Sequence, residues 1–154
     1  MCLYVKSVND FKKAAEDIPC WKVLEYGFPP EYAMDIEEDD ELKRNPGWFT
    51  PFVFYPISSD IITPREDTVE WNRDWSSIEG GIIHCFNNFE NAQDTAGAWP
   101  NCYVLEAIIP KGTEYIEGSD TSRWGYINNY GSKCVKIIDP IFLDSISTGE
   151  PPKL

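Results

Sequence analysis

The chain has little that is basic and little that titrates near neutral pH. It contains one histidine, and 13 lysines and arginines stand against 26 aspartates and glutamates, for a formal net charge of −13. A charge of this sign repels a phosphate backbone and an anionic lipid surface, which argues against direct nucleic-acid binding and membrane-surface binding. The same charge attracts a basic protein. The alternative is an acidic surface that only keeps the protein in solution.

Several motifs are also missing. No run approaches the roughly 20 apolar residues of a membrane span, and residues 1–6 lack a signal-peptide pattern, so we expect a cytoplasmic protein. The chain has no Gly-x-Ser-x-Gly elbow, no glycine-rich phosphate loop and no His-Glu-x-x-His pair. Without a complete catalytic set, the sequence favours a protein that is not an enzyme and needs no cofactor.

The cysteines are five in number and include no Cys-x-x-Cys pair: Cys2, Cys20, Cys85, Cys102 and Cys134. An odd set without close pairs predicts reduced, mostly buried thiols. A zinc site would need the single histidine and thiols from distant strands, so we expect no metal.

The clearest structural signal is a strand, helix and strand between residues 80 and 109. Two glycines at 80–81 predict a turn, and the β-branched and aromatic run that follows predicts a strand over 82–86. Asn87 is typical of a helix cap, with Glu90 completing a capping box. One helical face then carries small and apolar side chains: Phe89, Ala92, Gln93 and Ala96. The apolar run 102–109 predicts a central strand covered on both sides.

The rest of the chain extends this pattern. We expect strands at 2–6, 20–26 and 133–138 and a helix at 7–17 capped by Ser7. The sequence therefore predicts a single α+β domain over residues 1–144, with a mixed, mostly antiparallel sheet and two short helices packed on it. Residues 145–154 are expected to form a flexible tail.

An acidic segment interrupts this domain between residues 27 and 47. Six of its carboxylates lie close together: Asp35, Glu37, Glu38, Asp39, Asp40 and Glu41. The ligand order of an EF-hand loop is absent, which argues against calcium. The segment is either a solvated loop or a surface that binds a basic partner.

Residues 48–57 form an aromatic run. Trp48, Phe52 and Tyr55 are candidates for ligand binding, because aromatic rings can stack on a base or another flat ligand. The same run is also typical of a core strand. Prolines at 51 and 56 confine it to a sheet edge or a strand end.

His84 is the candidate catalytic residue, as a general base or as the partner of a thiol. Cys85 is not that thiol, because adjacent side chains of a strand point to opposite faces. A satisfied structural histidine is the alternative.

A resemblance is carried by three stretches: 20–24 (Cys-Trp-Lys-Val-Leu), 81–86 (Gly-Ile-Ile-His-Cys-Phe) and 109–118 (Ile-Pro-Lys-Gly-Thr-Glu-Tyr-Ile-Glu-Gly). The pattern resembles a family of small uncharacterised proteins of phages and gut Bacteroidetes, which implies a phage or mobile-element protein acting in a host cytoplasm. More distantly, it looks like the central part of ADP-ribosyltransferase-type folds. That likeness implies an NAD site in which His84 holds the nicotinamide-ribose and Glu114 or Glu117 activates the acceptor.

Two functions follow. The first is an acidic, non-enzymatic binding protein that inhibits or modulates a basic protein, such as a nucleic-acid-binding or defence protein. The second is a nucleotide-binding, NAD-binding or ADP-ribosyltransferase-like protein with a small-molecule site around His84.

Overall fold

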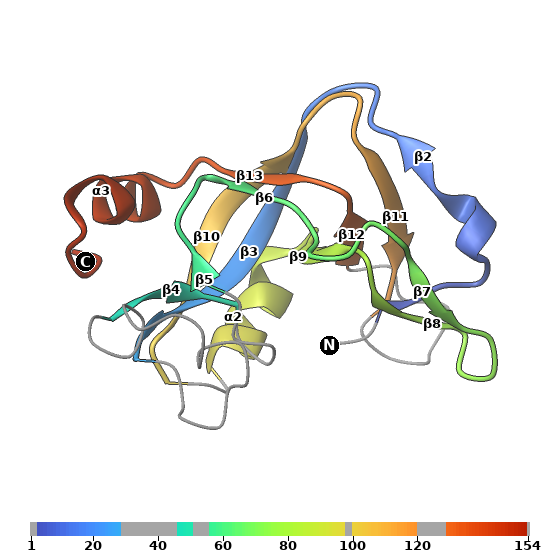
Figure 1. Ribbon diagram of the computed structural model, residues 1–154, viewed down its shortest axis with the longest axis horizontal. Helices are drawn as coiled ribbons and strands as arrows, with labels where there is room; N and C mark the ends of the chain where they lie inside the picture. Colours follow the sequence, from blue (N-terminus) through green and yellow to red (C-terminus); the bar gives the residue numbers. More distant parts are fainter. Residues whose placement is uncertain (1–2, 29–45, 51–55, 98–99, 120–128, 154) are drawn as a thin grey trace.

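The computed structural model describes residues 3–28, 46–50, 56–97, 100–119 and 129–153 (Figure 1). The elements, in chain order, are β1 (Leu3–Tyr4), the 3-10 turn η1 (Val8–Asp10), β2 (Lys12–Lys13), β3 (Ile18–Gly27), β4 (Gly47–Phe49), β5 (Pro56–Ile57), β6 (Ile61–Ile62), β7 (Glu70–Asn72), β8 (Ser77–Gly80), β9 (Ile83–Phe86), α2 (Phe89–Gly97), β10 (Cys102–Ile109), β11 (Glu114–Gly118), β12 (Asn129–Ser132), β13 (Val135–Ile137) and α3 (Pro140–Thr148).

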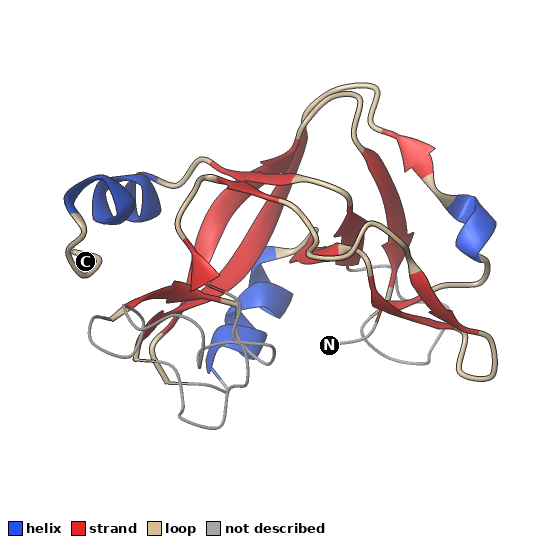
Figure 2. Ribbon diagram, in the orientation of Figure 1, coloured by secondary structure: helices blue, strands red, loops and turns tan. Residues whose placement is uncertain are grey.

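The described residues form two α-helices and antiparallel sheets in one domain, which confirms the predicted α+β class (Figure 2). The larger sheet has the order β2-β11-β12-β9-β3-β10-β13-β6, with β4 also paired to β3 and β5 to β4. A smaller sheet has the order β1-β8-β7. Within the described part of the chain, no helix has the length and apolar character needed to cross a membrane.

The centre of the larger sheet is the pair β3 and β10, which run side by side in Figure 1. Because side chains alternate along each strand, the pair has two faces. Leu24 and Leu105 belong to the main core, against which Phe142 of α3 is fully buried. On the opposite face, Val23 packs in a separate cluster with Ala92 of α2. The expected central strand, covered on both sides, is therefore confirmed.

The predicted strand, helix and strand are also present as β9, α2 and β10. Gly81 makes the turn before β9 with φ of +82°, and a Cβ there would lie 2.3 Å from the Thr68 carbonyl oxygen. The helix cap is one residue later than the predicted Asn87. Asn88 makes the capping bond, since its Oδ1 accepts from the backbone N–H of Asn91 at 3.2 Å.

The helix predicted over residues 7–17 is wrong. Ser7 does cap a turn, because its Oγ accepts from the Asn9 N–H at 3.1 Å, but only η1 follows. The backbone then leaves the helical path and pairs with the start of β11. Ala14 donates to the Thr113 carbonyl at 2.9 Å and accepts from Gly112 at 2.8 Å. Pairing with a distant part of the chain thus satisfies the backbone N–H and C=O groups that a helix would have bonded internally.

The second helix lies instead at α3, where the sequence analysis placed the end of the domain and the start of a tail. Pro140 occupies the first turn of α3, and Asp139 caps it by accepting from the Ile141 N–H at 3.0 Å. Gly149 ends it in a left-handed conformation with φ of +74°. Ser145, the expected first residue of the tail, is buried within this helix.

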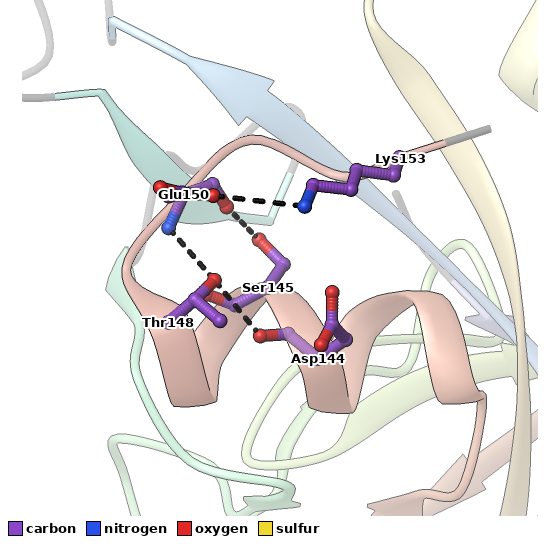
Figure 3. Close-up of polar contacts among 5 residues, drawn as sticks. All are labelled: Asp144, Ser145, Thr148, Glu150 and Lys153. Atoms are coloured by element: carbon purple, nitrogen blue, oxygen red, sulfur yellow. Dashed lines mark hydrogen bonds and ion pairs between the residues drawn. The ribbon is translucent and has the colours of Figure 1, made fainter.

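A chain of hydrogen bonds fixes the end of α3 to the sheet. The indole N–H of Trp48, in β4, donates to Ser145 Oγ at 3.0 Å, and Ser145 in turn donates to the carbonyl of Glu150. Figure 3 shows the polar contacts around this turn. Thr148 Oγ1 donates to the Asp144 carbonyl at 3.1 Å and accepts from the Glu150 N–H at 3.2 Å. The chain after the helix therefore folds back onto it.

We expect Ser145→Ala to destabilise the protein by about 1–3 kcal/mol, because it leaves the buried indole N–H of Trp48 without its acceptor. The matched control is Ser147→Ala, at an exposed position of the same helix. Chemical denaturation of both variants measures the free energy of unfolding. Equal stability of the two variants would show that the Trp48–Ser145 bond contributes little.

Candidate functional site

His84 lies in β9 at the middle of the larger sheet, where it is partly buried. Its ring contacts the ring of Phe86 edge-on, with the centroids 5.2 Å apart. His84 and Phe86 share one face of the strand, and Phe86 belongs to the cluster covered by α2. Cys85 projects to the other face, as the sequence analysis expected from strand alternation.

The electrostatic surroundings of His84 keep its ring neutral. Burial, followed by the positive charge of Lys22, lowers the pKa of His84 to about 3. The Lys22 ammonium also donates a hydrogen bond to the backbone carbonyl of His84 at 2.8 Å. An imidazole with such a low pKa is a weak base and carries no proton to donate at neutral pH. His84 is therefore poorly suited to act as a general acid or base at neutral pH.

The two acidic partners that the resemblance implied do not meet His84. Along the register of β11, β12 and β9, Glu117 lies opposite Tyr130, and Tyr130 lies opposite Cys85. Glu117 is thus on the Cys85 face of the sheet, and His84 is on the other. Its carboxylate pairs instead with Lys12, at 3.5 Å.

Glu114 shares the face of His84 but lies far along it. It is exposed and pairs in register with Lys13 of β2. Its strand is separated from β9 by β12, which places the two backbones about 10 Å apart at the usual strand spacing. The described geometry therefore does not assemble the histidine–glutamate pair of an ADP-ribosyltransferase-type site.

A row of polar side chains that the sequence analysis did not single out crosses the opposite face. Lys22, Cys85, Tyr130 and Glu117 come from β3, β9, β12 and β11, at matching positions of the strand register. Lys22 is only 8% exposed, and burial lowers its pKa, with the neighbouring Cys85 and Cys20 opposing that shift. A lysine within the apolar run 20–24 was the available signal, because charged side chains rarely occupy such positions without a partner.

The thiol of Cys85 in this row, and those of Cys102 and Cys134 outside it, are poor nucleophiles. A hydrogen bond with Cys20, followed by burial, raises the pKa of Cys85 well above its ordinary value. Burial and the nearby Glu25 carboxylate raise the pKa of Cys102 to about 11, and burial raises that of Cys134. Protonated thiols neither attack an electrophile nor bind a metal well. No group of three or more metal-binding side chains occurs among the residues that the structure describes.

Lys22 joins two strands of the larger sheet. Its strand, β3, meets β9 through a single aligned pair, Trp21 and Phe86. The bond from the Lys22 ammonium to the His84 carbonyl adds a charge-assisted link between the same two strands. This bond gives Lys22 a structural role in joining the two strands, and it uses the backbone of His84 rather than its ring.

Of the aromatic ligand candidates, Trp48 is in the core. It is 4% exposed and meets the rings of Tyr26, Tyr103 and Phe142 edge-on, at centroid distances of 5.3, 5.4 and 5.2 Å. A flat ligand cannot stack on a ring that is covered in this way. Phe52 and Tyr55 lie outside the described residues.

The acidic segment expected to bind a partner, with all six carboxylates between 35 and 41, also lies outside the described residues. The described surface carries a second concentration of negative charge, on the β7–β8 hairpin and the residues before it. A hydrogen bond and the charge of Glu66, then slight burial and the charge of Glu79, raise the pKa of Glu70. Carboxylates raise one another's pKa only when they are held close together, so negative charge is concentrated on this hairpin.

We expect the stability of the protein to fall as the pH drops from about 6.5 towards 3, in part because of His84. Its folded-state pKa is depressed to about 3, so the unfolded chain takes up a proton first over this window. Each pH unit costs up to about 1.4 kcal/mol.

His84→Gln removes this effect and should show a flatter dependence of unfolding free energy on pH between 7 and about 4.5. Denaturation curves of wild type and variant at matched pH values measure the difference. Parallel curves would mean that His84 titrates normally in the folded protein.

Comparisons with known proteins leave function to the geometry alone. The chain matches no family model, no curated protein and no solved structure. The resemblance to phage and Bacteroidetes proteins thus stays a prediction from the sequence.

Proposed function

We propose that the protein acts by binding a basic protein partner through its acidic surface, and that it is not an enzyme. The observation that carries this proposal is the distribution of charge. The chain has a net charge of −13, and Glu66 and Glu79 lie close enough to Glu70 to raise the pKa of its carboxyl group. A cationic surface placed against these carboxylates relieves their mutual repulsion and speeds encounter.

The geometry around His84 supports this choice over a nucleotide or NAD site. His84 is neutral and Glu117 is on the opposite face of the sheet, while Glu114 is two strands away. In the phage-type setting implied by the sequence, we propose a cytoplasmic partner that binds nucleic acid or takes part in defence. The acidic protein would inhibit or modulate it by occupying its basic surface.

The first test captures partners of the tagged protein from an extract of the cells that produce it, with elution by increasing salt. We expect a basic protein, and we expect its dissociation constant, measured with the purified components, to rise at least about tenfold from low to high ionic strength. A partner of neutral or acidic character, or binding that salt leaves unchanged, would overturn the proposal.

Neutralising the acidic segment tests its share of the binding. The variant changes six carboxylates to their amides: Asp35, Glu37, Glu38, Asp39, Asp40 and Glu41. The control neutralises six exposed carboxylates elsewhere and thus has the same net charge: Asp10, Glu16, Glu90, Asp94, Glu106 and Asp144. We expect the first variant to bind the identified partner more weakly than the second. Equal loss would show that only total charge matters.

A further inference from the structure

The β7–β8 hairpin presents a tryptophan to solvent. Trp75, in the turn between the two strands, is 69% exposed, more than any other large hydrophobic side chain among the described residues. In Figure 1 this hairpin projects at one end of the molecule, at the lower right, and α3 lies at the opposite end. An indole is among the largest apolar side chains, so its exposure to water leaves a large apolar area that a partner could bury with a gain in free energy.

The turn that holds Trp75 is braced on both sides. Asn72 Oδ1 accepts from the backbone N–H groups of Asp74 and Trp75, at 3.1 and 3.3 Å. Ser76 has a positive φ of 51°, and its carbonyl accepts from the Val5 N–H at 3.0 Å. The backbone beneath the exposed indole is therefore fixed to the smaller sheet. A binding residue fixed in this way loses little conformational entropy when a partner arrives.

The same asparagine connects the tryptophan to the carboxylates. Asn72 Nδ2 donates to Glu79 Oε1 at 3.1 Å, so one side chain holds both the Trp75 amide and the Glu79 carboxylate. Glu70 is directly opposite Gly80 in the register of the hairpin, next to Glu79. Residues 70–80 carry three carboxylates, those of Glu70, Asp74 and Glu79, against one arginine, Arg73. This excess of negative charge repels nucleic acid and anionic lipid, and it attracts a cationic side chain to the hairpin.

Resting on the proposed function, we propose that the β7–β8 hairpin is the docking surface for the basic partner, and that Trp75 is the anchor on which an arginine of that partner stacks. A guanidinium is planar, is weakly hydrated and stacks on an indole face through a cation–π contact. Glu70 and Glu79 then pair with neighbouring basic side chains of the partner. Tryptophan and arginine are both enriched among the few residues that contribute most of the binding energy at protein interfaces.

The test uses an oligo-arginine peptide as a defined probe and an oligo-lysine peptide of equal length for comparison. The ¹⁵N-labelled protein gives one indole signal for each of its six tryptophans, and Trp75→Phe identifies that of Trp75. We expect oligo-arginine to shift the Trp75 indole signal first. We also expect Trp75→Ala to weaken oligo-arginine binding about fivefold and oligo-lysine binding less.

Phe89→Ala is the matched control, because Phe89 is an exposed aromatic residue on α2. It should bind both peptides as the wild type does. If oligo-arginine binds at low salt but Trp75→Ala binds it equally well, the hairpin proposal is overturned and the proposal of a basic partner stands. If neither peptide binds at low salt, both proposals fall.

Discussion

The ladder between β3 and β10 is the constraint on which the rest of the structure depends. Eight consecutive residue pairs join the two strands, from Cys102 opposite Glu25 to Ile109 opposite Ile18. Because alternate side chains go to opposite faces, this one register assigns each residue of the pair to the main core or to the layer under α2. A slip by a single residue would exchange the two faces and place Lys22 among the aromatic and alanine side chains of that layer.

The sequence predicted those parts of the fold in which local and tertiary signals agree. Strand propensity, the turn at Gly81 and the small residues of α2 all favour the observed order of β9, α2 and β10. The predicted first helix is absent because Lys12 and Lys13 pair with the start of β11 and Ala14 bonds to the turn before it, contacts that no local pattern reveals. The missed α3 had readable signals in Pro140 and Gly149, which mark the first turn and the end of the helix, but residues 145–154 were predicted to be a flexible tail.

The candidate site shows the same division. That His84 lies in a strand followed from its neighbours, but its chemistry depends on which residues other strands bring near it. The register alone separates it from Glu117, and burial beside Lys22 alone makes it neutral. A single sequence without pairing information contains neither fact. The exposure of Trp75 was equally hidden, because a tryptophan in an irregular stretch is as typical of a buried residue that pins the connection as of an exposed one.

The bond between Trp48 and Ser145 joins residues almost a hundred positions apart, and it has a consequence for biosynthesis. On a ribosome, β3 and β4 emerge long before the helix that covers the Trp48 indole. Until the segment up to Glu150 has been made, this indole and the core side chains that pack against Phe142 remain exposed to other chains. Nascent molecules therefore expose an apolar surface for most of their synthesis, and such a surface makes them prone to aggregate until the chain is complete.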